Sequence, residues 1–185
     1  MIESTESSSR LEQIQVGHHT LDRLLVKNEA PAAENRSQGE LAGYRDALKL
    51  IHENADNMPI TTGVVRQLHR ELMQYTPARG GEYKIGANDI VEKAPDGRVL
   101  RVRFQTVQPI QVEDYMRELH ARFQQTLDAG EFEPLLLAPL YVHDLLCIHP
   151  FSDGNGRIAR LMTVLLLRKL DYRVGRYVSL ERIIE

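Results

Sequence analysis

The sequence predicts a mainly α-helical fold with one small β-hairpin, on three observations. Apolar residues recur at helical spacing along most of the chain. Helix-forming residues dominate, while tryptophan is absent and only 8 of the 185 residues are proline. Near the middle, two β-prone runs flank Asp96-Gly97, a dipeptide that favours tight hairpin turns. With 42% hydrophobic residues, a chain of this length can bury one substantial core, so we expect one main domain.

The first part of the chain predicts a short helix and then two longer ones. The short helix starts near Ser7-Ser8-Ser9, whose hydroxyls can cap it. Its apolar stripe consists of Leu11, Ile14, Leu21, Leu24 and Leu25. Residues 27–39 read as a linker between helices. The next helix carries Leu41, Tyr44, Leu48 and Ile51 at helical spacing. The one after it follows Pro59, is capped by Thr61 or Thr62, and carries Val64, Val65, Leu68 and Leu72.

The middle of the chain changes from helical to strand-like character. Gly80-Gly81 breaks the helical pattern, and the runs 85–91 and 99–107 are rich in β-prone residues. We therefore expect a β-hairpin that turns at Asp96-Gly97. After Pro109 the helical period returns, with apolar positions at Val112, Tyr115, Met116, Leu119 and Phe123.

Two apolar helices joined by a glycine-containing loop are predicted next. The segment from Pro134 to Ile148 is nearly all apolar, so we expect it to be buried as a central helix that must stop at Pro150. A second apolar helix runs from Ile158 to Leu170. The last residues, 179–185, resemble a helix cut short, so we expect the chain to be part of a longer protein.

Composition and charge exclude several classes of protein. A net charge of -3 gives no sequence-independent reason to bind nucleic acid, and no direct nucleic-acid binding is expected. No apolar stretch approaches the roughly 20 residues needed to cross a bilayer, and the polar N-terminus is unlike a signal peptide. The single cysteine, Cys147, cannot form an internal disulfide, which suits a reducing compartment. We therefore expect a cytoplasmic protein without membrane contact.

The loop from His149 to Arg160 combines features that bind phosphates. Glycines at 154 and 156 let backbone N–H groups approach an anion closely, and the helix that follows presents its positive dipole end to the same place. Arg157 and Arg160 are three residues apart, so we expect them on one helical face, where guanidinium groups can hold further phosphates. Asp153 supplies a hard oxygen ligand for Mg²⁺. His149 has a near-neutral intrinsic pKa and could accept a proton from an attacking hydroxyl.

This stretch resembles the signature of Fic domains, His-Pro-Phe-x-Asp/Glu-Gly-Asn-Gly-Arg-x-x-Arg, with every defined position filled. The resemblance implies a Fic fold in which His149 is the general base and Asp153 binds Mg²⁺. It also implies a nucleotide-binding set made up of Gly154, Asn155, Gly156, Arg157 and Arg160. Phe151 would anchor the loop as an apolar plug. The implied activity is AMP transfer from ATP to a Ser, Thr or Tyr hydroxyl of a target protein.

The resemblance extends to the elements on either side of the loop. The hairpin at about 85–104 resembles the family's flap, which binds an extended segment of the protein substrate by strand pairing. At the N-terminus, residues 8–13 resemble the family's inhibitory pattern, Ser/Thr-x-x-x-Glu-Gly/Asn, although Gln13 departs from it. By this resemblance Ser8 and Glu12 are inhibitory, and Glu12 pairs with Arg160 and obstructs productive ATP binding. The implied division is an inhibitory helix region at 1–30 and a Fic catalytic domain at 31–185.

Several alternatives remain open at this point. Within the same fold, the chain could remove AMP from a modified protein, act as a Doc-like kinase, or be a binding module without activity. From another class, His143-Asp144 resembles the doublet of metal-dependent phosphohydrolases, although the other histidines show no ligand-like spacing. The plainest alternative for the loop is a helix–turn–helix connection with solvated arginines. The sequence leaves the target protein, the nucleotide preference and the oligomeric state, a homodimer included, undetermined.

Overall fold

The structure is a computed structural model that describes residues 2–12, 16–32 and 35–172. It divides into two compact units, residues 1–81 with 156–185 and residues 82–155, and each is described by itself. The helical elements of the first unit are α1 (Ile2–Leu11), α2 (His18–Leu21), η1 (Asp22–Val26), α3 (Arg36–Asn54), η2 (Ala55–Asn57), α4 (Thr62–Met73) and α7 (Asn155–Lys169). The second unit contains β1 (Ile90–Lys93), β2 (Val99–Phe104), η3 (Pro109–Gln111), α5 (Val112–Ala129) and α6 (Pro134–Ile148). The predicted mainly α-helical fold with one small antiparallel hairpin is confirmed.

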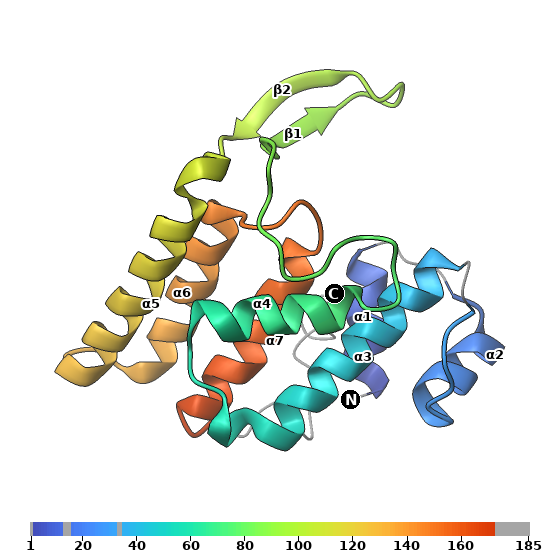
Figure 1. Cartoon of the computed structure of the whole chain (residues 1–185), viewed down its shortest axis with the longest axis horizontal. Helices are drawn as coiled ribbons and strands as arrows, with labels where there is room; N and C mark the ends of the chain where they lie inside the picture. Colours follow the sequence, from blue (N-terminus) through green and yellow to red (C-terminus); the bar gives the residue numbers. More distant parts are fainter. Residues whose placement is uncertain (1, 13–15, 33–34, 173–185) are drawn as a thin grey trace. The chain divides into compact units, whose positions relative to one another are not determined.

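Helices α3 and α4 pack side by side in the first unit (Figure 1). Two glycines of α3 make this close approach possible. A Cβ atom at Gly43 would lie 2.1 Å from the carbonyl oxygen of Leu72, and one at Gly39 would lie 2.2 Å from that of Tyr75. Neither backbone oxygen can move aside easily, so both positions require glycine. Gly39 thus belongs to α3, and the prediction that 36–39 are linker was wrong.

The start of α4 follows the prediction closely. Thr61 is the N-cap residue, with extended backbone angles, and its side-chain oxygen accepts a hydrogen bond from the backbone N–H of Val64. The apolar positions read from the sequence form the buried side of the helix: Val64, Val65, Leu68 and Leu72.

Helix α1 packs against α3 with a face made of hydroxyl side chains. Its buried residues are Ser4, Thr5, Ser7, Ser8 and Ser9. The prediction that the serines cap the start of a helix was wrong, because they lie inside one that begins at Ile2. Ser9 satisfies its hydroxyl by donating to the carbonyl of Thr5, at 2.9 Å. Buried hydroxyls need such partners, and this one finds its acceptor within α1 itself. Of the predicted apolar stripe, Ile14 falls outside the described residues.

The second unit contains the hairpin and the α5–α6 pair, which lie together in Figure 1. The strands pair antiparallel, with Ile90 opposite Phe104 and Val91 opposite Val102. Gly97 adopts a φ of 84° at the turn, which a side chain would disfavour. The first strand is shorter than predicted, since 85–89 do not form strand.

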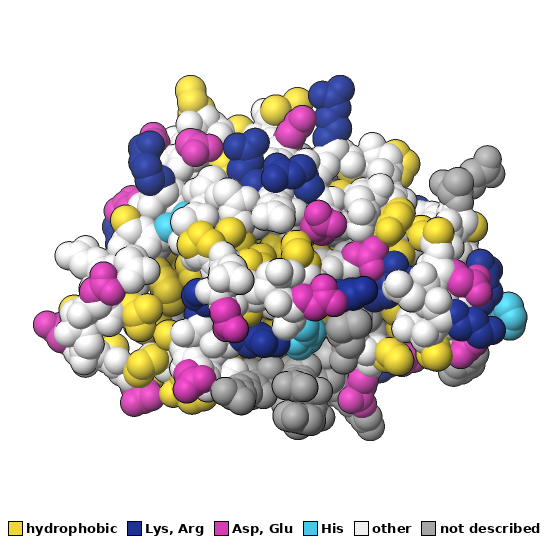
Figure 2. Space-filling model, turned by 60° about the horizontal axis from the view of Figure 1, so that its bottom comes forward, with side chains coloured by type: hydrophobic (Ala, Val, Ile, Leu, Met, Phe, Trp, Pro, Cys, Tyr) yellow, Lys and Arg dark blue, Asp and Glu magenta, His cyan; other side chains and the backbone are white. Residues whose placement is uncertain are grey.

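Helix α6 is less buried than the sequence suggested. Its inner face packs against α5, but Leu135, Leu136 and Leu140 are 46%, 56% and 60% exposed. The prediction of a central helix buried on all sides was therefore wrong for the outer face. Figure 2 shows apolar side chains exposed between charged ones on one face of the molecule. Within the described part of the chain, no helix is both long and apolar enough to span a bilayer.

Candidate functional site

His149 sits where α6 ends. The backbone of this residue is left-handed, with a φ of 53°, and its N–H donates to the carbonyl of Leu145 at 3.0 Å, closing the helix. Pro150 follows and cannot continue the helix. The ring Nδ1 lies 3.3 Å from the carbonyl oxygen of Leu146. Because a carbonyl oxygen can only accept, Nδ1 carries the proton in this contact, and the lone pair of Nε2 is left to act as a base.

The surroundings of His149 favour its neutral form. Burial lowers the pKa of the half-buried ring, and the positive charge of Lys84 lowers it further. The hydrogen bond to Leu146 acts in the opposite direction and does not cancel these effects. A pKa below the usual 6.5 means that the imidazole is mostly deprotonated at neutral pH. It is therefore available to accept a proton.

The residues after His149 form a turn closed by its own side chains. Phe151 is fully buried, as expected of an anchor, and its ring lies 5.7 Å from that of Tyr83, measured between centroids. The side chain of Asn155 accepts from the Phe151 N–H at 3.0 Å and donates to the Phe151 carbonyl at 2.7 Å. Gly154 has a φ of 78°. Glycine is needed there for the chain to turn back towards the start of α7.

Asp153 lies at the exposed side of this turn. One of its carboxylate oxygens accepts from the N–H of Gly154 at 2.6 Å. An exposed carboxylate fits Mg²⁺, which typically binds one or two protein carboxylates and takes its other ligands from water and phosphates. Among the residues the structure describes, no three His, Cys, Asp or Glu side chains gather into a metal-binding group. An ion at Asp153 would therefore share its coordination with a substrate.

The first turn of α7 faces a carboxylate from the N-terminal region. A Cβ atom at Gly156 would lie 2.7 Å from the Oε1 atom of Glu12 and 3.5 Å from Nη1 of Arg160. Because Gly156 lacks that atom, the Glu12 carboxylate can lie directly against the start of the helix. A negative group is stabilised at this end of a 15-residue helix by the unpaired N–H groups and the helix dipole. The Glu12 carboxylate thus lies beside Gly156, a residue of the predicted anion site, and phosphate binding there stays a prediction.

Arg160 joins α7 to the same N-terminal segment. Its Nη2 atom lies 2.7 Å from Oε1 of Glu12, and its Nε donates to the hydroxyl of Ser8 at 2.8 Å. A longer bond of 3.4 Å reaches the Ser8 carbonyl. The structure thus brings together Ser8, Glu12, Gly156 and Arg160, four of the residues that the sequence singled out.

Arg157 has different surroundings from Arg160. It is only 4% exposed, and its Nη1 atom lies 3.7 Å from Oε2 of Glu40 on α3. Glu40 also accepts from Nε of Arg36, at 2.8 Å. The two arginines therefore have different partners: Arg157 lies near Glu40 on α3, and Arg160 binds Ser8 and Glu12. A phosphate contact by Arg157 stays a prediction.

Two residues that hold the loop from the hairpin side were not predicted from the sequence. Lys84 and Asn88 are polar residues just before β1, and their side chains bind backbone carbonyls at 148, 149 and 151. Lys84 is 3% exposed. A buried lysine has no periodic signature in a single sequence, because lysines usually lie in solvent.

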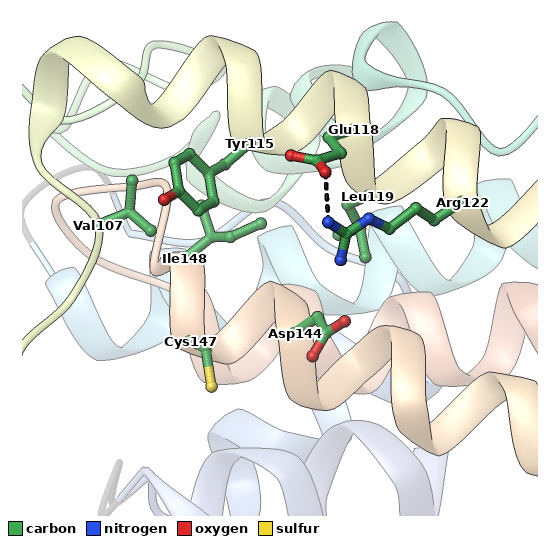
Figure 3. A pocket seen from close by; sticks show the side chains of 8 residues that line it. All are labelled: Val107, Tyr115, Glu118, Leu119, Arg122, Asp144, Cys147 and Ile148. Carbon is green, nitrogen blue, oxygen red and sulfur yellow. Dashed lines mark hydrogen bonds and ion pairs between the residues drawn. The ribbon is translucent and has the colours of Figure 1, made fainter.

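A groove lies between α5 and α6, and its lining includes Ile148, the residue before His149 (Figure 3). Its volume is about 220 Å³, and Val107, Leu119 and Ile148 supply apolar walls. Figure 3 shows Glu118 and Arg122 forming an ion pair on α5, with Asp144 on α6 across from them.

Both side chains of the His143-Asp144 doublet are largely exposed, although Asp144 lines the groove. The two side chains are 73% and 57% exposed, with 3.3 Å between Nδ1 and Oδ1. Neither belongs to a cluster of three metal-ligating side chains among the described residues. The phosphohydrolase alternative therefore gains no support.

Comparison with known proteins places the loop in a family. A model of the Fic/DOC family matches residues 59–167, more than half of the chain. The protein adenylyltransferase Fic of Drosophila willistoni is 30% identical over 139 residues, 72% of this chain and 25% of that protein. A ribonucleoside-diphosphate reductase small chain of Ostreid herpesvirus 1 is 30% identical over 121 residues, 62% of this chain and 20% of that protein. The chain thus spans a quarter or less of either relative.

A solved structure supports the same fold. A Fic-domain-containing signalling protein from Bacteroides thetaiotaomicron aligns with a TM-score of 0.76 and 27% identity, over 91% of this chain and 62% of that one.

Proposed function

Because the chain belongs to the Fic/DOC family, we propose that it is a protein adenylyltransferase, which transfers AMP from ATP to a Ser, Thr or Tyr hydroxyl of a target protein. The observation that carries this proposal is the state of His149. Its Nδ1 faces a carbonyl oxygen, its pKa is lowered, and its Nε2 is left to accept a proton. The similarity to the protein adenylyltransferase Fic of Drosophila willistoni supports the same reaction.

In this reaction Nε2 of His149 takes the proton of the target hydroxyl as the hydroxyl oxygen attacks the α-phosphorus of ATP. The bond between that phosphorus and its bridging oxygen breaks, and pyrophosphate leaves. Backbone N–H groups at Gly154, Asn155 and Gly156 would hold phosphate oxygens at the start of α7, and Arg160 would bind an outer phosphate. Most of the rate then comes from positioning and charge neutralisation.

Asp153 would hold Mg²⁺, and the ion would neutralise negative charge on the phosphates. The hairpin β1–β2 would present the target. An extended segment that pairs with an open strand edge places its residues at fixed intervals, which sets the hydroxyl near the base.

We further propose that the described state is inhibited by Glu12 and Ser8. The Glu12 carboxylate lies where the start of α7 would hold a phosphate and uses the Nη2 atom of Arg160 at 2.7 Å. Ser8 engages Nε of the same guanidinium. A phosphate group would have to displace the carboxylate, because two anions cannot share this position without repulsion. ATP in its productive arrangement therefore competes with Glu12.

Label transfer from ATP tests the proposed reaction. The Glu12→Gly protein is incubated with Mg²⁺, lysate proteins and ATP labelled on either the α- or the γ-phosphate. We expect covalent label from the α-position only, on the protein itself or on a lysate protein. Adding His149→Ala should reduce the rate at least about a hundredfold, as loss of a general base does. His143→Ala, which changes an exposed histidine of the same helix, is the matched control and should leave the rate unchanged.

Two results would contradict the proposal. Label from the γ-phosphate alone would indicate a kinase. No label with any variant would indicate a binding module.

A further inference from the structure

Two residues, Lys84 and Asn88, donate hydrogen bonds to four successive backbone carbonyls around His149. The Nζ atom of Lys84 donates to the carbonyl of Ile148 at 3.3 Å, and its backbone N–H donates to that of Pro150 at 2.9 Å. The side-chain amide of Asn88 donates to the carbonyls of His149, at 3.3 Å, and Phe151, at 2.7 Å. Every peptide unit from the last residue of α6 to the buried Phe151 is therefore held from the same side.

The ammonium group of Lys84 is fully satisfied by neutral partners. Besides the Ile148 carbonyl, it donates to Oδ1 of Asn88 at 2.6 Å and to the hydroxyl of Thr106 at 2.9 Å. An ammonium has three N–H donors, and three acceptors meet them. Burial lowers the pKa of Lys84, and Asp89 partly opposes that effect. A buried cation without a directly bonded carboxylate is costly, so stability alone gives little reason to place a lysine here.

The same residues tie the two strands of the hairpin together at their base. Asn88 and Asp89 immediately precede β1, and Thr106 lies two residues after Phe104, the last residue of β2. The backbone N–H of Thr106 donates to Oδ1 of Asp89 at 2.9 Å, and its hydroxyl lies 3.0 Å from Oδ1 of Asn88. Whatever moves the strands therefore moves the donors that hold the loop at His149.

We infer that Lys84 is a positioning residue that, together with Asn88 and Thr106, fixes the backbone of His149 to the base of the hairpin. This inference rests on the proposed function, in which the hairpin holds the target and His149 deprotonates it. One hydrogen-bond network holds both the hairpin and the backbone of His149. A target segment paired with the hairpin therefore brings its hydroxyl to a set distance from the imidazole. Lys84 touches neither substrate nor the reacting atoms and acts through the loop. Its charge also helps to keep the nearby imidazole neutral.

The test replaces Lys84 and follows both the reaction and the His149 ring. Lys84→Met keeps the length of the side chain and removes its charge and donors. In the Glu12→Gly background we expect kcat for label transfer to fall at least about tenfold, with KM for ATP within about twofold, because misplacement of a catalytic group affects the chemical step. Lys49→Met, at an exposed lysine of α3, is the control.

The ring itself gives a readout that does not depend on activity. His149 is identified in histidine-selective NMR spectra by its loss in His149→Ala, and its titration is then compared between variants. We expect Lys84→Met to raise the His149 pKa, because a neighbouring cation is lost. Lys84→Arg should restore the titration and part of kcat. Asn88→Leu should lower kcat with a smaller change in the titration, since it removes two bonds to the loop and no charge.

The outcomes separate this inference from the proposed function. A folded Lys84→Met protein whose kcat and His149 titration both match those of Lys49→Met would overturn the inference. If the starting protein transfers no label, the proposed function fails and the titration alone decides on Lys84. If Lys84→Met does not fold, Thr106→Val removes one acceptor of the ammonium with little change in volume. Thr106→Val should lower kcat and raise the His149 pKa, each by less than is expected for Lys84→Met. No change in either quantity would contradict the inference.

Discussion

At the scale of single residues, His149 combines two roles in one position. Its left-handed backbone ends α6 and starts the turn, and its ring is half buried with Nδ1 against the Leu146 carbonyl. The backbone conformation sets where the side chain points, and the carbonyl sets which nitrogen carries the proton. A non-glycine residue with positive φ costs conformational energy, which the bond donated by Asn88 and the bond that the His149 N–H donates to the Leu145 carbonyl offset.

The lowered pKa of His149 predicts how the reaction depends on pH. Only the neutral imidazole accepts a proton, and burial lowers the pKa below the ordinary 6.5. The pH of half-maximal rate should therefore lie below 6.5, with the rate falling towards acidic pH as the ring becomes protonated. Initial rates of label transfer between pH 5 and 8, at saturating ATP, measure this. A half-maximal rate at or above pH 6.5 would show that the ring is not shielded as described.

The sequence could predict some of these residues and not others. Glu12, Ser8 and Arg160 belong to short patterns with fixed spacing, and the structure brings them into contact. The different settings of Arg157 and Arg160 could not be read from their spacing, because three residues leave the two side chains only about 60° apart around the helix, and their partners come from distant parts of the chain. Lys84 was missed because its burial depends on oxygens that come from residues 88, 106 and 148.

At the scale of elements, the contact of α3 with α4 depends on missing side chains. Gly39 and Gly43 lie four residues apart, hence on one face of α3, and both meet backbone carbonyls of the α4 segment. Periodicity predicted both helices from their apolar residues. It could not show that their backbones touch, because glycine contributes no apolar signal. Gly39 also falls in the segment predicted as a linker.

Alanine in place of Gly43 in α3 and of Gly63 in α4 should change the stability of the protein in opposite directions. Gly43→Ala places a methyl group about 2 Å from the Leu72 carbonyl, so the helices must separate, and we expect a loss of about 3 kcal/mol or more in the free energy of unfolding. Gly63→Ala is the control. Its methyl group meets nothing closer than 3.8 Å, and alanine should stabilise α4 by roughly 0.5–1 kcal/mol. Urea unfolding of both variants measures the difference, and equal stabilities would contradict this description of the contact.

Helix α1 shows why a serine run is ambiguous in a sequence. Serine is a favoured cap, but it is also small enough to pack closely between helices. Here the run forms the buried face, and Ser8 directs its hydroxyl to Arg160. A face of hydroxyls buries little apolar surface, so α1 is held less firmly than the apolar helices. This suits a segment whose release would expose a binding site.

At the scale of the whole molecule, the boundary between the two compact units falls inside the signature, between Asn155 and Gly156. His149 and Asp153 belong to the unit with the hairpin, and Arg160 belongs to the unit with α1 and α3. The proposed base and the proposed inhibitor are thus carried by different units. The helices and the hairpin that form both units were predictable from periodicity and turn signals. The exposed outer face of α6 was not, because an all-apolar helix gives no indication of which side stays uncovered.

Removing the charge of Glu12 should strengthen nucleotide binding. Glu12→Gln keeps the size of the side chain and replaces a charge-assisted hydrogen bond, a type that contributes roughly 1.5–3 kcal/mol, with a weaker one. We expect the Kd for ATP with Mg²⁺ to fall at least about tenfold by calorimetry. Glu6→Gln, which removes the carboxylate of α1 that pairs with Arg10, should leave this Kd unchanged. Equal affinities of the two variants would exclude Glu12 from inhibition and leave the catalytic loop untouched.

The position of a bound nucleotide tests the central claim most directly. The Glu12→Gly protein is crystallised with Mg²⁺ and an ATP analogue that cannot be cleaved. We predict phosphates against the backbone N–H groups of residues 154–156, an outer phosphate on Arg160 and the α-phosphate towards Nε2 of His149. A structure in which the nucleotide binds elsewhere while this turn stays empty would contradict the account.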